Sequence, residues 1–182
     1  AYNITTGDYG ANTNAYDAIL QSGFTTNSTV AMSGGTENAR YRISGSHLDQ
    51  EGILKGTGLR KVTANINSSM RLLNNRRLGI DFNLVASQIK EKIGAISNDA
   101  GFTGNVISTA LQFNPTRPLR KSDGSINNYF DGSTLNPLEL VEGYKDRATT
   151  STVMGSISPS YKITNDLEYK LVYGFNYGTG IR

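Results

Sequence analysis

Apolar and polar residues alternate with a period of two along several segments of the chain. This is the pattern of β-strands that bury one face and leave the other in water. The clearest segment places apolar side chains on one face at Leu167, Tyr169, Leu171, Tyr173, Phe175 and Tyr177. Similar alternation predicts six strands, at about 24–33, 39–48, 60–71, 77–89, 149–162 and 167–178.

Each predicted strand is close to ten residues long, which is the length that a tilted strand needs to cross the hydrocarbon layer of a membrane. Strands of soluble proteins more often have five or six residues. The polar faces suit the wet lumen of a barrel, although the sheets of a soluble sandwich alternate in the same way. The predicted lumen-facing residues are Arg40, Arg42, Asn65, Asn67, Asp81, Asn83, Glu168 and Lys170.

Short and long connections alternate between these strands. The short ones, 34–37, 74–77 and 164–166, hold the Gly and Asn that tight turns favour. The long ones are 49–58 and 93–147. Outer-membrane barrels have short periplasmic turns and long extracellular loops. The predicted fold class is therefore all-β: a segment of an antiparallel transmembrane β-barrel with one long extracellular loop.

Two further predictions concern the loop at 93–147. Val106, Ala110 and Phe113 have helical spacing, so this stretch is a candidate short helix that ends before Pro115. Aromatic residues and Arg are the types that anchor interfaces, which suggests ligand or partner contacts in the loop. Simple packing of the loop is the other interpretation. The candidate contact residues are Arg117, Tyr129 and Phe130.

Composition and charge narrow the class of protein. Hydrophobic residues make up 37% of the chain, below the roughly 45–50% of globular domains, but a barrel strand needs an apolar residue only at every second position. The net charge of +3 is spread along the chain, so nucleic acid is not an expected partner. Cysteine is absent, which excludes disulfides, thiolate metal sites and a Cys nucleophile.

The residues offer no catalytic, metal or cofactor site. His47 is the single histidine, so neither a triad nor a multi-histidine metal site can form, and a rim or loop position suits it. Asp49 and Glu51 could form a loop ion site, but a solvated turn is the simpler interpretation. An enzyme is therefore the weakest function class.

The chain is expected to be an internal piece of a larger barrel. It opens on Ala1 without the basic and apolar segments of a signal peptide, and it has no apolar run of the ~20 residues that a membrane helix needs. Six strands cannot close, since the smallest barrels have about eight. We expect a lead-in segment at 1–23, a partial barrel at 24–182, and sheet edges that pair with residues outside this sequence, so the chain should not fold alone.

Several motifs resemble the SusC/RagA family of TonB-linked receptors, and they occur in the family's order over most of the chain. They are Ser33-Gly-Gly-Thr-Glu37, Leu48-Asp-Gln-Glu-Gly-Ile53, Gly56-Thr-Gly58, Ala110-Leu-Gln-Phe-Asn-Pro-Thr-Arg-Pro-Leu119, Asp123-Gly-Ser125, Ala148-Thr-Thr150 and the stretch from Ser158 to Tyr169.

The resemblance implies a parent barrel of about 22 strands with a plug inside it, in the outer membrane of a Bacteroidota bacterium. It implies import of glycans or oligopeptides, driven by TonB, with a SusD-like surface lipoprotein over the barrel mouth. The expected partners are the rest of the barrel and plug, this lipoprotein, TonB through parts outside this sequence, and membrane lipid. A soluble β-sandwich carbohydrate-binding module is the alternative.

Overall fold

The computed structural model describes residues 8–96, 104–128 and 135–182. The chain divides into two compact units. The helical unit comprises Ala1–Phe24, Glu51–Gly58 and Lys92–Arg147, and the sheet unit comprises Thr25–Gln50, Leu59–Glu91 and Ala148–Arg182.

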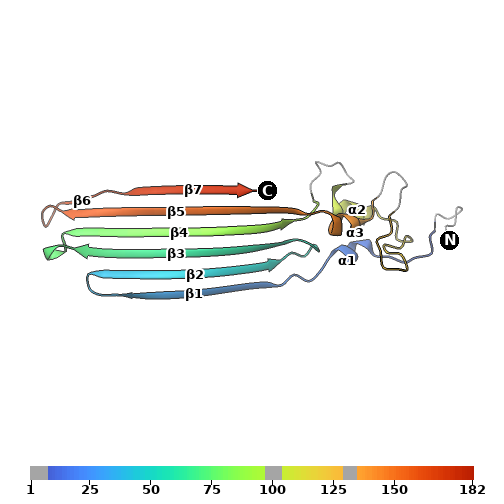
Figure 1. Cartoon of the computed structure of the whole chain (residues 1–182), viewed down its shortest axis with the longest axis horizontal. Helices are drawn as coiled ribbons and strands as arrows, with labels where there is room; N and C mark the ends of the chain where they lie inside the picture. The colour runs from blue at the N-terminus through green and yellow to red at the C-terminus, as the bar shows by residue number, and fades with distance from the viewer. Residues whose placement is uncertain (1–7, 97–103, 129–134) are drawn as a thin grey trace. The chain divides into compact units, whose positions relative to one another are not determined.

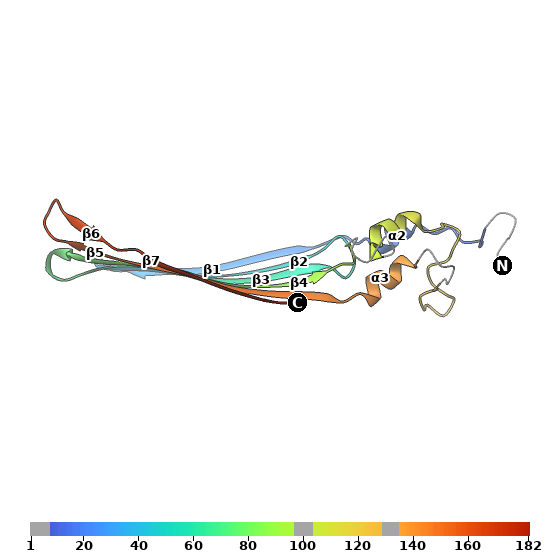
Figure 2. The same cartoon turned by 90° about the horizontal axis from the view of Figure 1, so that it is seen from above.

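The sheet unit is a meander of long strands, in which each strand lies beside the one that precedes it in the chain. The arrows in Figure 1 alternate in direction, so the sheet is antiparallel, and Figure 2 shows one twisted layer. Its order is β1-β2-β3-β4-β5-β6, with β7 also on β5. The strands are β1 (Thr25–Gly35), β2 (Ala39–Glu51), β3 (Gly58–Leu72), β4 (Leu78–Ile93), β5 (Asp146–Lys162), β6 (Glu168–Lys170) and β7 (Tyr173–Ile181).

The predicted antiparallel sheet of long strands is confirmed, and the sheet is open. Its edges are β1 and the β6–β7 side, neither of which has a further strand partner among the described residues. A short 3₁₀ turn, η1 (Asn74–Arg76), joins β3 to β4. Residue 75 in this turn has φ 65°, which Asn tolerates better than most residues.

One predicted strand needs correction. The segment 167–178 is divided into β6 and β7, with Leu171 and Val172 between them. The register does not shift, because Tyr161 faces Tyr169 and Ile157 faces Tyr173 across the same ladder. Leu171 donates its N–H to the carbonyl of Pro159 at 2.9 Å. Proline has no N–H to return the bond, so the ladder is interrupted there.

The described part of the helical unit contains three short helices: α1 (Ala15–Ile19), α2 (Val106–Gln112) and α3 (Pro137–Gly143). Each begins after an asparagine whose side chain accepts a backbone N–H of the first turn, which is a preferred helix start. These caps are Asn14, Asn105 and Asn136. Among the described residues, none of these helices is long or apolar enough to cross a membrane.

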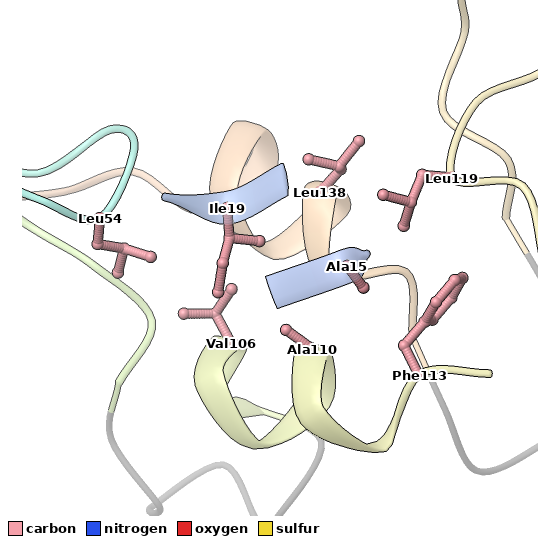
Figure 3. Packing of buried hydrophobic residues seen from close by; sticks show 8 residues of the cluster. All are labelled: Ala15, Ile19, Leu54, Val106, Ala110, Phe113, Leu119 and Leu138. Atoms are coloured by element: carbon pink, nitrogen blue, oxygen red, sulfur yellow. The ribbon is translucent and has the colours of Figure 1, made fainter. Parts of the chain in front are cut away.

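The three helices share an apolar core, drawn in Figure 3. Val106, Ala110 and Phe113 are all buried, so the face predicted from their spacing exists, and α2 ends before Pro115 as predicted. The structure adds α1 and α3, which the sequence pattern did not reveal. The core cluster consists of Ala15, Ile19, Leu54, Val106, Ala110, Phe113, Leu119 and Leu138.

Residues that precede β1 form backbone hydrogen bonds with the long connection. The backbone N–H of Ala11 bonds the carbonyl of Thr116 at 2.9 Å, and that of Thr13 bonds the carbonyl of Pro115 at 2.8 Å. Ile19 is fully buried in the core. The expected lead-in segment and the long loop therefore belong to one packed unit, while the extent of the barrel within 24–182 stays a prediction.

Candidate functional site

The two faces of the sheet differ in chemistry, and the strand register defines them. On β1 and β2, Ser33 faces Arg42, and one step along the ladder Met32 faces Ile43. Successive side chains of a strand point to opposite sides. We name the side that carries Arg40 and Arg42 the polar face, and the side that carries Tyr41 and Ile43 the apolar face.

The polar face gathers most of the predicted lumen-facing residues. Five of them line one shallow groove across β2, β3 and β4 with a volume of about 310 Å³. Asn65 lies on the same side of β3, two positions before Asn67. Glu168 and Lys170 also project to this face, opposite Lys162 and Ser160. The five residues in the groove are Arg40, Arg42, Asn67, Asp81 and Asn83.

An ion pair on the polar face involves a residue that the sequence analysis did not single out. Arg71 Nη1 lies 3.1 Å from Asp81 Oδ1, and Ser69 also hydrogen-bonds the carboxylate. Gly79 leaves space for this arrangement, because a Cβ there would lie 3.1 Å from Arg71 Nη1. Arg71 continues the two-residue spacing of Asn67 and Ser69, which is the signal that could have found it.

The apolar face carries large side chains that no described residue covers. Val30 is 75% exposed, Tyr173 65% and Val62 53%. Fully burying such a side chain is worth roughly 1.5–3 kcal/mol, so a whole face of them is not stable in water. The face fits a membrane, or another surface that excludes water.

All aromatic residues on the described strands lie on the apolar face. Several are neighbours on β5, β6 and β7, where Tyr161 faces Tyr169 and Phe175 faces Gly155. Among the residues that line the groove of the polar face, Tyr41 is the one aromatic residue. The aromatic residues of these strands are Tyr41, Phe82, Tyr161, Tyr169, Tyr173, Phe175 and Tyr177.

The other residues of the sheet that the sequence analysis considered are His47 and Asp49. His47 faces Ser28 on the apolar side of β2. Asp49 lies within β2 and pairs with Arg60 at 2.9 Å, so it is engaged by a strand neighbour. Within the described ranges, no group of His, Asp or Glu side chains could hold a metal ion.

Arg117 is half-buried in the helical unit, where it contacts Tyr9. Its guanidinium is 4.8 Å from the centre of the Tyr9 ring, and its Nη2 donates to the Tyr9 hydroxyl at 3.1 Å. These contacts support the packing interpretation, and a contact of Arg117 with a ligand or partner stays a prediction. The other two loop candidates, Tyr129 and Phe130, lie outside the described residues.

A single antiparallel layer of long strands, polar on one face and apolar and aromatic on the other, is the architecture of the wall of an outer-membrane β-barrel. The comparisons with known proteins agree. TonB-dependent receptor P3 of Formosa agariphila is 28% identical over 168 residues, which is 91% of this chain and 17% of the receptor. TonB-dependent receptor SusC of Bacteroides thetaiotaomicron is 27% identical, over 93% of this chain and 18% of SusC.

TonB-dependent receptor P26 of Formosa agariphila is 31% identical over 65% of the chain and 11% of its own length. No family model matches. The chain spans less than a fifth of the length of these curated relatives. It is thus homologous, over most of its own length, to part of TonB-dependent receptors that include SusC. Such receptors are outer-membrane transport proteins, which confirms the predicted location and the prediction that the chain is not an enzyme.

Proposed function

We propose that the chain forms part of the barrel wall of a TonB-dependent importer of large nutrients. In this proposal the apolar face contacts membrane lipid and the polar face lines the lumen. The observation that carries the proposal is the separation of the two faces along strands of membrane-spanning length. On β3, which has 15 residues, the apolar side runs from Val62 to Leu72. At about 3.3 Å per residue and a tilt near 40°, this stretch covers roughly 28 Å. This exceeds the apolar band of about 25 Å.

The soluble alternative fits these observations less well. A β-sandwich needs a second sheet over the apolar face, but the described residues form one sheet and leave that face exposed. A carbohydrate-binding module would also be expected to present aromatic rings in its binding groove. The groove on the polar face is lined mainly by Arg, Asp, Asn and Ser, and Tyr41 is the one aromatic residue among those that line it.

The relationship to SusC supports a proposal for the substrate and the partners. We propose glycans or oligopeptides as the imported material and a SusD-like surface lipoprotein as the partner at the barrel mouth. Energy coupling through TonB and closure by a plug would belong to parts outside this chain. The contact residues in the outer connections would come from the helical unit, for which Arg117, Tyr129 and Phe130 are the sequence candidates.

Labelling at adjacent residues tests the membrane proposal. Because the chain has no cysteine, single variants V62C and T63C place a thiol on the apolar and the polar side of β3 within one step. In the complete receptor in lipid, a fluorophore at residue 62 should be quenched by a lipid-confined quencher, and one at residue 63 by a water-soluble quencher. Equal quenching by the soluble agent at both positions would contradict the proposal.

Co-purification tests the partner and the substrate. The tagged complete receptor is isolated from its native host membranes, and its associated lipoproteins and bound oligomers are identified by mass spectrometry. We expect a surface lipoprotein in near-equal amount. If the receptor still imports its nutrient in cells that lack every such lipoprotein, the proposed partner is wrong. The labelling result would not be affected.

A further inference from the structure

The apolar face ends in hydrophilic side chains at the end of the sheet where β3 begins and β4 ends (Figure 1). On β3 the residues of this face run from Val62 to Leu72, and Arg60 precedes them. On β4 they run from Leu78 to Ala86, and Gln88 and Lys90 follow. This end adjoins the long connections, which lie outside the cell in outer-membrane barrels, so we name it the outer end.

Arg60 and Lys90 lie at the same level on neighbouring strands. Ser69 of β3 hydrogen-bonds Asp81 of β4, and nine residues along each strand from that contact, toward the outer end, are Arg60 and Lys90. Both side chains project from the apolar face, because the side chains of a strand alternate between its two sides. Directly opposed residues of antiparallel strands have Cβ atoms about 4.5–5.5 Å apart, so one anionic group can contact both cations.

The two cations have a single carboxylate partner among the described residues. Arg60 Nε lies 2.9 Å from Asp49 Oδ2, and 67% of the Arg60 side chain is exposed. Lys90 is exposed as well and forms no ion pair with any described residue. Opposed like charges destabilise a sheet, and an anion bound between them would remove this repulsion. The outer end of the apolar face is therefore suited to an anionic ligand.

A row of hydrogen-bonding side chains follows on the membrane side of the two cations, one level nearer to the apolar residues. His47 of β2 and Gln88 of β4 are each two positions along their strands from the level of the cations. Gln88 Nε2 donates to Ser151 Oγ of β5 at 3.3 Å, and Val62 of β3 lies between His47 and Gln88. From β2 to β5 the row crosses three strand spacings, or roughly 14 Å, so it is wider than a single phosphate.

We propose that Arg60 and Lys90 bind a phosphate of a phosphorylated glycolipid in the outer leaflet, and that the row of hydrogen-bonding side chains contacts its sugars. The proposal rests on the proposed function, in which the apolar face contacts membrane lipid. Guanidinium and ammonium groups bind phosphate through charge-assisted hydrogen bonds. The acyl chains of the same lipid would lie against the apolar residues that follow the row.

The width of the row favours a glycolipid over a phospholipid. A phospholipid headgroup presents one phosphodiester, which Arg60 and Lys90 alone can bind. The hydroxyl groups of a sugar headgroup can also use His47, Gln88 and Ser151, across roughly 14 Å. A glycolipid that carries phosphate therefore matches both the charge and the extent of this surface, whereas an anionic phospholipid matches the charge alone.

Native mass spectrometry of the complete receptor, released from detergent micelles with added lipid, tests the proposal. The probe is monophosphoryl lipid A, and the comparison lipids are its dephosphorylated form and phosphatidylglycerol. The variant R60Q/K90Q removes the two cations. K61Q/K170Q is the matched control, because it removes the same charge from the polar face of the sheet. R60K/K90R keeps both charges and is the rescue variant.

We expect the unsubstituted receptor to bind the phosphorylated lipid A about tenfold more tightly than either comparison lipid. R60Q/K90Q should lose this preference, while K61Q/K170Q and R60K/K90R keep it. Equal binding of the dephosphorylated form or of phosphatidylglycerol, or an equal loss in K61Q/K170Q, would overturn the proposal. If R60Q/K90Q does not fold, the comparison of the three lipids on the unsubstituted receptor decides.

The lipid labelling at residues 62 and 63 reports the barrel wall separately. A receptor with lipid contact at residue 62 but without a preference for the phosphorylated lipid A would disprove this inference alone. A receptor without lipid contact at residue 62 would disprove the proposed function itself.

Discussion

The ring of Tyr41 covers Gly34 on the facing strand. The two residues are direct partners in the β1–β2 register, and a Cβ built on Gly34 would lie 2.7 Å from the Tyr41 hydroxyl oxygen and 3.0 Å from Cζ. Phe175 covers Gly155 in the same way across β5 and β7. Such pairs protect a glycine of a sheet with an aromatic ring and help to fix the strand register.

Substituting Gly34 with Ala should therefore weaken the β1–β2 pair. The new methyl would force the Tyr41 ring away from β1, at a cost of about 0.2–1 kcal/mol for the lost cross-strand contact. G45A is the matched control, because the nearest atom to a Cβ there is the Thr63 carbonyl oxygen at 3.9 Å. Thermal unfolding of the folded receptor in detergent, followed by its shift in gel mobility, should show a lower midpoint for G34A only. Equal midpoints would contradict the role of the ring.

Replacing Pro159 should complete the β5 ladder. P159A supplies an N–H that can bond the carbonyl of Leu171, whose own N–H already bonds Pro159. We expect the amide of residue 159 to be protected from hydrogen exchange in the folded receptor, with a gain of about 0.5–1.5 kcal/mol for the bond. The loss of proline rigidity in the unfolded chain offsets about 0.4–1 kcal/mol of this gain. Rapid exchange at residue 159 would show that the interruption has another cause.

Asn136 should be the most sensitive polar residue of the helical unit. It is fully buried, its Nδ2 donates to the carbonyls of Leu119 and Asn127 at 2.7 and 3.0 Å, and its Oδ1 caps α3 at Leu138. N136A removes these three hydrogen bonds from the interior of the unit, at a cost of about 1–3 kcal/mol. The Leu119 carbonyl keeps one partner, the backbone N–H of Asn127 at 3.0 Å.

The matched control for N136A is N14A at the start of α1, where the cap is exposed and its loss costs about 0.5–2 kcal/mol. Limited proteolysis should cleave the N136A receptor in the 93–147 connection faster than it cleaves the N14A receptor. A similar rate for both variants would show that the buried bonds contribute little.

The turn at Asp123 should depend on pH. Hydrogen bonds from the Ser125 hydroxyl and backbone N–H lower the pKa of the Asp123 carboxyl below its usual value of 3.8. A lowered pKa means that the turn gains stability once the carboxyl is ionised and loses it as the pH falls through the folded-state pKa. Exchange of the Ser125 amide should become faster, relative to its intrinsic rate, below about pH 4. D123N should lack this change, and a pH-dependent D123N turn would refute the assignment.

The strand positions could be predicted from the sequence because the alternation of apolar and polar residues is a local property of each strand. Leu78, Ile80 and Phe82 against Gly79, Asp81 and Asn83 indicate a strand and its two faces without knowledge of the neighbours. Five of the eight lumen-facing candidates lie together in one groove for the same reason. The break in the strand at Leu171 could not be predicted, because it depends on which residue lies opposite Pro159 in the sheet.

The sequence by itself determined a two-faced antiparallel sheet, a short amphipathic helix and the relationship to SusC-type receptors, since these depend on local periodicity and ordered motifs. The tertiary structure decided which residues meet across the chain. It placed Arg71 beside Asp81, Tyr41 over Gly34 and Arg117 against Tyr9, and it packed the residues before β1 with the long connection. These contacts depend on strand register and helix docking, which are set by packing between segments that are distant in the sequence.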